Sequence, residues 1–276
     1  MSGLWHRLRR AARRAAAIRD SRARGGPRCG TSGFVGRPLH RAALWPELIA
    51  QWQLDEAWAR WMDEREGSRC AWCGSSLRSS GLAGAIVAEV HARHGTRATR
   101  LKTLFREPRA RRLAIAEINS AGNLHRYLAA CPGLRYSEYG SRHPAVPSED
   151  LCALSYADAS FDLVVTSDTL EHVPDVDAAL REILRVLKPG AAHVFTTPVV
   201  WDRPSRQRAR LEHGRIVHLL PPSHHGDPHR PSDDFIVFHE FGADFPERCR
   251  AAGFELALRR DARNPALVTF VARRPA

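Results

Sequence analysis

The stretch LSYADASFDLVVTSDTLEHVPDVDAALREILRVLKPGAAHVFTTP, residues 154–198, decides the fold of this chain. It contains an apolar run at 161–168, a segment with helical spacing at 175–190 and a second apolar run at 192–198. The helical segment begins with acids and ends in Pro-Gly, which are typical of a helix start and a helix stop. Strand, helix and strand in this order predict two parallel strands joined by a crossover helix.

The same alternation continues on both sides of this stretch. We predict strands at 112–118, near 134–138 and near 148–151, a helix at 122–131, and an antiparallel closing pair of strands within 253–274. This pattern predicts an α/β fold with a doubly wound, mostly parallel sheet and helices on both faces. In such sheets ligands bind at the carboxyl ends of the central strands, where the strand order reverses.

Composition divides the chain into three parts. Residues 1–28 are a basic tail or helix, residues 29–100 a small module rich in cysteine and tryptophan, and residues 101–276 the α/β domain with an insertion at about 199–238. Tryptophan and leucine recur at helical spacing over 44–67, which predicts one or two helices in the core of the small module. A linking helix is expected over 80–95.

Most of the net charge of +12 comes from the N-terminus, because residues 1–28 hold nine arginines and a single acid, Asp20. An arginine-rich amphipathic helix can lie on an anionic membrane surface or pair with acidic partners, whereas a frayed, solvated terminus is the alternative. No stretch is long enough to span a membrane, and no secretory signal is evident. These features predict a cytoplasmic protein.

Two cysteine turns share one template. C29GTSG33 and C70AWCG74 both follow C-x-x-[C/S]-G, the form of a knuckle in a zinc ribbon. Cys29, Cys70 and Cys73 are therefore candidate zinc ligands. The fourth position holds Ser32, a poor ligand, and His40 could substitute for it. A degenerate ribbon without metal is the main alternative, and a disulfide is disfavoured in the cytosol.

The string FDLVV, LEHVPD and RVLKPG within 154–198 resembles the class I (Rossmann-like) S-adenosylmethionine-dependent methyltransferases. The order and spacing match over about 45 residues, and the resemblance extends more weakly over 112–273. It implies the seven-stranded type of sheet, S-adenosylmethionine as cofactor and methyl transfer as the reaction. The first 100 residues lie outside this resemblance.

The resemblance also implies roles for individual residues. The acid of the first family motif corresponds to Glu117, and the loop behind it contains Asn119 and Gly122. Asn119, Ala121 and Asn123 stand where the family often has glycine, and alanine and asparagine are its least disruptive replacements. Glu138, at the end of the second strand, would accept both ribose hydroxyls. The remaining implied cofactor contacts are Asp150 with the adenine amine, Leu151 on the adenine ring and Ser167 at the end of the 161–168 strand.

Methyl transfer to an oxygen or nitrogen acceptor can require a general base, and histidine suits that task near neutral pH. The candidates are His172 in LEHVPD and His225 in the histidine-rich insertion. Four arginines precede the histidine-rich segment of this insertion and could meet an anionic substrate or form a solvated face. They are Arg203, Arg206, Arg208 and Arg210.

These features predict a methyltransferase that acts on an oxygen or nitrogen acceptor of a small molecule or glycan. A catalytically inactive binding module is the first alternative, since the cofactor loop is poor in glycine. An RNA-directed methyltransferase is the second, because of the arginine tail. A nicotinamide dehydrogenase is disfavoured, because a pyrophosphate needs close backbone approach that the missing glycines would impede.

Overall fold

A computed structural model describes residues 2–224 and 235–276 of the chain. Six strands form the main sheet in the order β11-β12-β6-β5-β3-β4. They are β3 (Ile115–Ile118), β4 (Leu134–Ser137), β5 (Phe161–Ser167), β6 (Leu187–Thr196), β11 (Glu255–Arg260) and β12 (Val268–Arg273). The β4-β3-β5-β6 part is parallel, and the closing strands β12 and β11 are antiparallel to β6 and to each other. The predicted doubly wound, mostly parallel sheet is confirmed.

The strand predicted near 148–151 is wrong. Only a single parallel bridge, between Glu138 and Ser148, stands at the outer edge of β4, so the described sheet has six strands rather than seven. The chain turns again at Asp150, whose side-chain Oδ1 accepts a hydrogen bond from the amide of Cys152 at 2.8 Å. An aspartate that bonds the backbone two residues on favours a turn over a strand.

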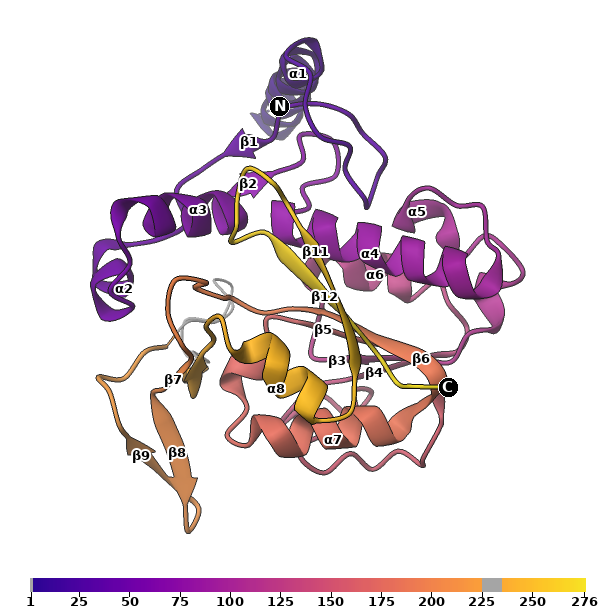
Figure 1. Cartoon of the computed structure of the whole chain (residues 1–276). Coiled ribbons are helices and arrows are strands. Elements are labelled where there is room, and N and C mark those ends of the chain that lie inside the picture. Colours follow the sequence, from indigo (N-terminus) through magenta and orange to yellow (C-terminus); the bar gives the residue numbers. More distant parts are fainter. Residues whose placement is uncertain (1, 225–234) are drawn as a thin grey trace.

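Two layers of helices cover the sheet. The helices are α4 (Leu77–His94), α5 (Leu101–Leu104), α6 (His125–Leu128), α7 (Val176–Val186) and α8 (Phe245–Ala251). Figure 1 shows α4 above the strands and α7 below them. Side chains that alternate along a strand point to opposite faces, so Ile118 packs in the core with α7 whereas Ile115 packs in the core with α4.

Two predicted helices are shorter in the structure. The segment predicted as a helix over 175–190 ends at Val186, and Leu187–Thr196 is already strand β6. The residue before a proline avoids helical geometry, which explains why Lys188, before Pro189, is extended. The segment predicted as a helix over 122–131 consists of a 3₁₀ turn, η2 (Gly122–Leu124), followed by α6.

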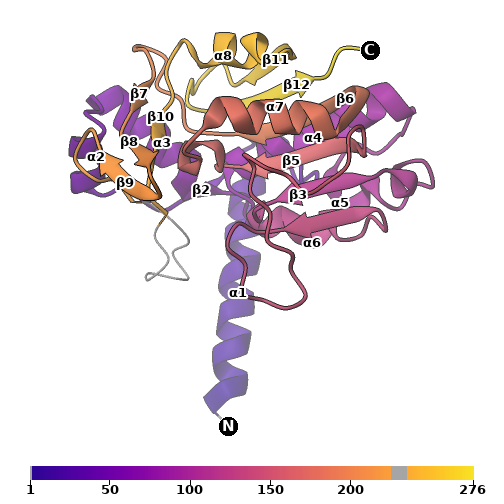
Figure 2. The same ribbon diagram turned by 90° about the horizontal axis from the view of Figure 1, so that it is seen from below.

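The N-terminal part begins with helix α1 (Ser2–Ala23), which projects from the body as a rod (Figures 1 and 2). Its other elements are β1 (Leu39–His40), α2 (Pro46–Gln51), α3 (Glu56–Gly67) and β2 (Ser68–Arg69). The buried residues Trp52, Trp58 and Met62 share a core with Val200 and Ala266 of the α/β domain. The tryptophan-rich helices therefore cover the α/β domain instead of forming a separate core.

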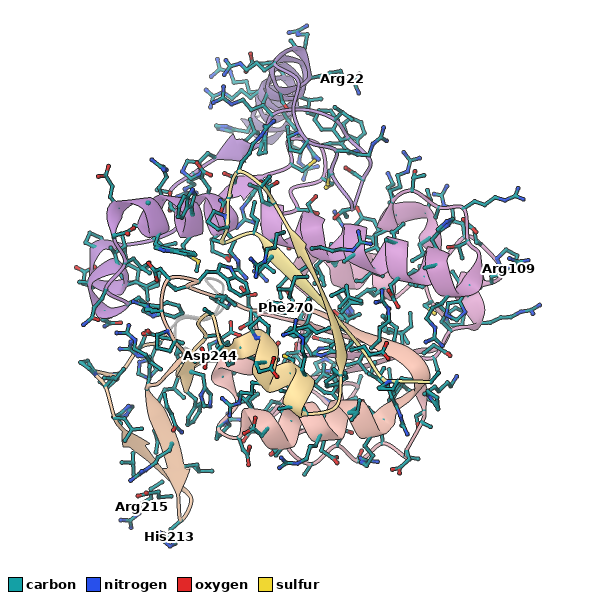
Figure 3. The ribbon with its side chains drawn as sticks, in the orientation of Figure 1. Arg22, Arg109, His213, Arg215, Asp244 and Phe270 are labelled. Atoms are coloured by element: carbon teal, nitrogen blue, oxygen red, sulfur yellow. The ribbon has the colours of Figure 1, made fainter. Side chains whose placement is uncertain are left out.

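The insertion adds short strands outside the main sheet. They are β7 (Arg206–Gln207), β8 (Ala209–Glu212), β9 (Arg215–His218) and β10 (His239–Glu240). Figure 3 shows His213 and Arg215 at the tip of the β8–β9 hairpin, far from the sheet, whereas Phe270 lies among the core side chains. Across the described residues, the helices lack the length and apolar character needed to cross a membrane.

Candidate functional site

The strand order reverses between β3 and β5, so the site expected for a ligand lies at the carboxyl ends of these two strands. After β3 the chain crosses to β4 on one side, and after β5 it crosses to β6 on the other. Residues from the ends of β3, β4 and β5 thus meet at one edge of the sheet. The positions predicted from the sequence for cofactor contact all lie in these three strand ends or in the turns that follow them.

Glu117 shapes the loop behind β3, residues 119–123, which we call the cofactor loop. Its carboxylate is fully buried and accepts hydrogen bonds from the amide of Ala121 at 2.9 Å and from Nδ1 of His125 at 2.7 Å. Burial raises the pKa of Glu117, although both of these donors act in the opposite direction. The carboxylate therefore ties the loop to the first turn of α6.

Asn119 adopts the left-handed backbone conformation for which glycine is the usual residue. Its φ is +56°, and its side-chain oxygen accepts the amide of Tyr139 at 2.8 Å. Asparagine tolerates this region better than most residues do. Ala121 has φ −75° and does not require glycine. Gly122 has φ +62°, and a Cβ there would meet no atom within 4 Å, so its outer side is open.

The end of β4 carries Glu138 and, beside it, the turn at 148–151. Glu138 is half-buried, and the hydroxyl of Tyr136 donates to its Oε1. The amide of Glu149 donates to the Glu138 carbonyl at 3.3 Å, which holds the turn next to the strand end. Within this turn Leu151 is buried and Asp150 is exposed. The tertiary structure thus brings together three of the predicted cofactor residues.

The end of β5 is held by two arginines from the N-terminal helices. Arg65 of α3 donates to both carboxylate oxygens of Asp168, at 2.7 and 2.8 Å, and Arg78 of α4 donates to Ser167 Oγ at 2.6 Å. Arg78 also pairs with Asp168 at 3.1 Å. Burial opposes ionisation of Asp168, but the two guanidinium groups outweigh it and hold the pKa of that carboxyl well below its usual value. Asp168 has φ +48°, an uncommon backbone region for a residue other than glycine.

Sequence reasoning missed Arg65 and Arg78. The signal for Arg65 was present, because Trp58, Met62 and Arg65 follow one another at spacings of four and three on α3. An arginine on the apolar stripe of a helix is expected to be buried and to need an acidic partner. For Arg78 we find no comparable signal, because apart from Leu77 the residues beside it in the chain are serines.

Glu171 and His172 lie just beyond Asp168, in the short 3₁₀ turn η3 (Leu170–His172). Glu171 is fully buried, its Oε2 accepts the hydroxyl of Thr197 at 2.9 Å, and no described residue donates a hydrogen bond to its Oε1. Burial, reinforced by the charge of Asp168, raises the pKa of Glu171 to about 8. Glu171 is therefore largely protonated at neutral pH.

His172 has the protonation state that a general base requires. Its Nδ1 lies 2.9 Å from the carbonyl oxygen of Ile236, and because a carbonyl only accepts, Nδ1 carries the proton. Its Nε2 lies 3.9 Å from Oε1 of Glu171. Burial lowers the pKa of His172, which keeps the ring neutral and leaves Nε2 able to accept a proton.

The buried carboxyl of Glu171 predicts a measurable pH dependence of stability. Between the usual pKa of 4.5 and about 8, folded chains keep a proton that unfolded chains have released. Stability therefore falls as pH rises through this range. Glu171→Gln retains the acceptor for Thr197 but has no such proton, so its melting midpoint relative to the native chain should rise by about 3 °C or more between pH 5.5 and 8.5.

Thermal melts at both pH values, with the exposed-residue variant Glu56→Gln as control, measure this difference. The melting midpoint of the Glu56→Gln control should differ from the native midpoint by the same amount at the two pH values. If the melting midpoint of Glu171→Gln also differs from that of the native chain by the same amount at both pH values, the assignment of a proton to Glu171 is contradicted.

The second predicted base, His225, lies outside the described residues. The arginines before it are engaged rather than free for a substrate. Arg203, Arg206 and Arg208 all pair with the buried carboxylate of Glu240, and Arg210 pairs with Glu212. These ion pairs tie the insertion together and also reach α2 and the residues after it, since Arg206 donates to the Trp52 carbonyl at 3.2 Å.

The three predicted metal ligands do meet. The sulfur atoms of Cys29, Cys70 and Cys73 lie within 4.8 Å of one another, and we call these residues the thiol cluster. The prediction that His40 could complete the site is wrong, because its ring nitrogens face Ser68 Oγ and Asp63 Oδ2, each at 3.0 Å. Ser32 instead lies beside the cluster, with its Oγ 3.7 Å from Cys70 Sγ.

Comparisons with known proteins agree with this arrangement. Residues 125–195 match the family model of a methyltransferase domain. A ubiquinone biosynthesis O-methyltransferase of Paracidovorax citrulli is 28% identical over 162 residues, covering 56% of this chain and 60% of that protein. An arsenite methyltransferase of Aquipseudomonas alcaligenes is 46% identical over 48 residues, which cover 17% of this chain and 14% of that protein. The chain thus spans less than two thirds of the length of these curated relatives.

Among solved structures, a 1,6-didemethyltoxoflavin-N1-methyltransferase of Burkholderia thailandensis, with bound 1,6-didemethyltoxoflavin and S-adenosylhomocysteine, is 18% identical with a TM-score of 0.43. The similarity covers 87% of this chain and 94% of that one.

The sheet order is that of a Rossmann-like α/β fold, in which a ligand site is expected at the carboxyl ends of the strands. Residues 125–195, which match the methyltransferase-domain model, include α6, β4, β5, α7 and most of β6, so the similarity falls on the parallel core of this sheet.

Proposed function

We propose that this protein is a methyltransferase that uses S-adenosylmethionine and acts on an oxygen or nitrogen acceptor of a small molecule or glycan. The observation that carries the proposal is the meeting of the cofactor loop, Glu138 and the Asp150–Leu151 turn at one edge of the sheet, in a chain whose residues 125–195 match a methyltransferase domain. Acceptor oxygens suit the hydroxyls of a ribose, and an apolar side chain suits an adenine ring. An open loop leaves room for a small charged tail.

The residues present fit such a cofactor. The outer side of Gly122 is open, Glu138 is half-buried with acceptor-only oxygens, and Leu151 is buried next to the exposed Asp150. Glu138 would bind the ribose hydroxyls, Asp150 the adenine amine and Leu151 the adenine ring, while the loop from Asn119 to Gly122 would hold the amino-acid end with Ser167 nearby. Glu117 would act through the loop, because one of its oxygens bonds Ala121 in the loop and the other bonds His125 at the start of α6.

When bound, the cofactor supplies an activated methyl group, so the protein has to orient the acceptor, exclude water and take up a proton where the acceptor carries one. His172 is our candidate for the last task because burial favours its neutral ring and its proton lies on Nδ1. Glu171, protonated at neutral pH, adds no negative charge beside that ring. The N-terminal helices α3 and α4 close over the end of β5 through Arg65 and Arg78, which supports exclusion of water there.

The test is a calorimetric titration of the full chain with S-adenosylhomocysteine, which cannot react. We expect saturable binding with a dissociation constant below about 1 mM, the upper end of typical enzyme affinities for substrates. A chain that gives no heat and no shift in melting temperature at millimolar cofactor would overturn the proposal.

An inactive binding module remains the alternative, and the glycine-poor loop is the observation that favours it. Transfer of labelled methyl groups from S-adenosylmethionine to pooled small-molecule and glycan acceptors separates the two functions. Cofactor binding without transfer to any acceptor would favour the inactive module.

A further inference from the structure

The thiol cluster has the dimensions of a zinc site. Zinc with tetrahedral geometry and Zn–S bonds of about 2.3 Å places two sulfur ligands about 3.8 Å apart. The Cys29 and Cys73 sulfurs are 3.7 Å apart, and Ser32 Oγ lies 3.7 Å from Cys70 Sγ on the remaining side. A disulfide would require about 2.05 Å between two of these sulfurs, and all three cysteines are free.

The backbone around the cluster repeats the same turn twice. The amide of Cys29 donates to the Phe34 carbonyl at 2.8 Å, and the amide of Cys70 donates to the Ser75 carbonyl at 2.8 Å. Each turn closes on a left-handed glycine that donates to the first cysteine. Gly33 (φ +76°) donates to the Cys29 carbonyl at 2.7 Å, and Gly74 (φ +77°) donates to the Cys70 carbonyl at 2.9 Å.

Two matched turns facing each other direct their side chains to one point. Packing alone does not require two copies of one turn, whereas two such turns can supply the ligands of one tetrahedral ion. The buried Cys29 and the half-buried Cys70 and Cys73 thus converge on one point.

The cluster is linked to the cofactor loop through Ser75. Ser75 Oγ lies 3.3 Å from Cys73 Sγ and accepts a hydrogen bond from Asn123 Nδ2 at 2.9 Å. Its hydroxyl donates to Thr31 Oγ1, in the other cysteine turn, at 3.0 Å. Arg126 of α6 donates to the Cys73 carbonyl at 3.3 Å. Ser75 therefore joins both cysteine turns to the loop.

We propose that Cys29, Cys70 and Cys73 bind one structural zinc ion, with Ser32 at the fourth corner, and that this ion holds the cofactor loop in place through Ser75 and Asn123. The metal site is independent of the proposed function. The role of the loop in cofactor binding rests on that function. The ion supplies folding free energy by joining two turns that are 41 positions apart in sequence, from Cys29 to Cys70.

Metal analysis of the full chain, purified after growth with added zinc, tests the site. We expect about one zinc per native chain, and X-ray absorption with three sulfurs at about 2.3 Å and one oxygen at about 2.0 Å. Cys73→Ala should lose the ion, whereas Cys152→Ser, which alters a half-buried thiol outside the cluster, should retain it. A native chain with less than about a fifth of an equivalent, or a Cys73→Ala chain that retains the ion, would overturn the site.

Ser32→Cys provides a second test that does not depend on a weakened fold. It completes a four-thiolate set, so zinc should be released to a chromophoric chelator at least about tenfold more slowly than from the native chain. An unchanged or faster release would show that Ser32 does not face the ion.

Hydrogen exchange of residues 119–128 tests the link to the loop without any need for cofactor. Zinc removal and Ser75→Ala should each increase exchange in this segment, and Ser75→Ala should still hold about one zinc. Ser80→Ala is the matched control, because Ser80 accepts from the Gly30 amide at 3.0 Å in the other turn and does not bond the loop. If exchange in residues 119–128 is unchanged after zinc removal, the link between the ion and the loop is overturned. A chain that only fails to bind the cofactor would contradict the proposed function and not this link.

Discussion

Arg65→Ala is expected to lower the melting midpoint by about 10 °C. The Arg65 side chain is 1% exposed, and it pairs with Asp168 and with Glu66. Removing one partner of a buried ion pair typically costs 3–5 kcal/mol, and Arg78 compensates the remaining charge of Asp168 only in part. For a chain of this size about 1 kcal/mol moves the midpoint by roughly 2–4 °C.

Two further variants separate charge from packing. Arg65→Met keeps most of the volume, and adding Asp168→Asn to it should recover part of the lost stability, since the carboxylate that lost its Arg65 partner is then gone. Arg60→Ala, on an exposed position of the same helix, should change the midpoint by no more than about 2 °C. An Arg65→Ala chain that melts within that same margin would refute the view that α3 is anchored at the end of β5.

Glu138→Gln is expected to weaken binding of S-adenosylhomocysteine by about 10- to 100-fold and to leave the fold intact. The proposed contacts are charge-assisted hydrogen bonds from two ribose hydroxyls, and such bonds contribute about 1.5–3 kcal/mol. An amide replaces one acceptor oxygen with a donor and removes the charge. The side chain is half-buried at a strand end, so little of the core depends on it.

Tyr136→Phe is the matched control for this measurement. It removes the hydroxyl that donates to Glu138 and leaves the carboxylate unchanged, so binding should fall much less. Calorimetric titration of the three chains gives the comparison. A Glu138→Gln chain that binds within about threefold of the native affinity would mean that the ribose is held elsewhere.

The central βαβ unit could be predicted from its local pattern. Residues 161–167 form a buried strand, α7 follows, and β6 lies parallel to β5, as the apolar runs and the helix signals indicate. Apolar periodicity reports burial, and burial on both faces is what a central parallel strand requires. The pairing of the closing strands β11 and β12 was predicted in the same way and is confirmed.

The segments with weak patterns were predicted less well. The turn at 148–151 contains apolar and polar residues that suit either a strand or a turn, and the side chain of Asp150 decides for the turn. The end of α7 depends on Pro189, whose effect reaches back to Lys188. The roles of the site residues remain predictions, and the structure adds their positions to them.

What the sequence by itself determined is the type of each main element, the parallel core and the strand ends where a site should lie, because these follow from periodicity within short windows. Only the tertiary structure decided which distant side chains meet there. Arg65 and Asp168 are 103 positions apart, and Asn123 and Ser75 are 48 positions apart. Such pairs are selected by burial and hydrogen-bond geometry in the packed chain, and no local pattern encodes a partner at that separation.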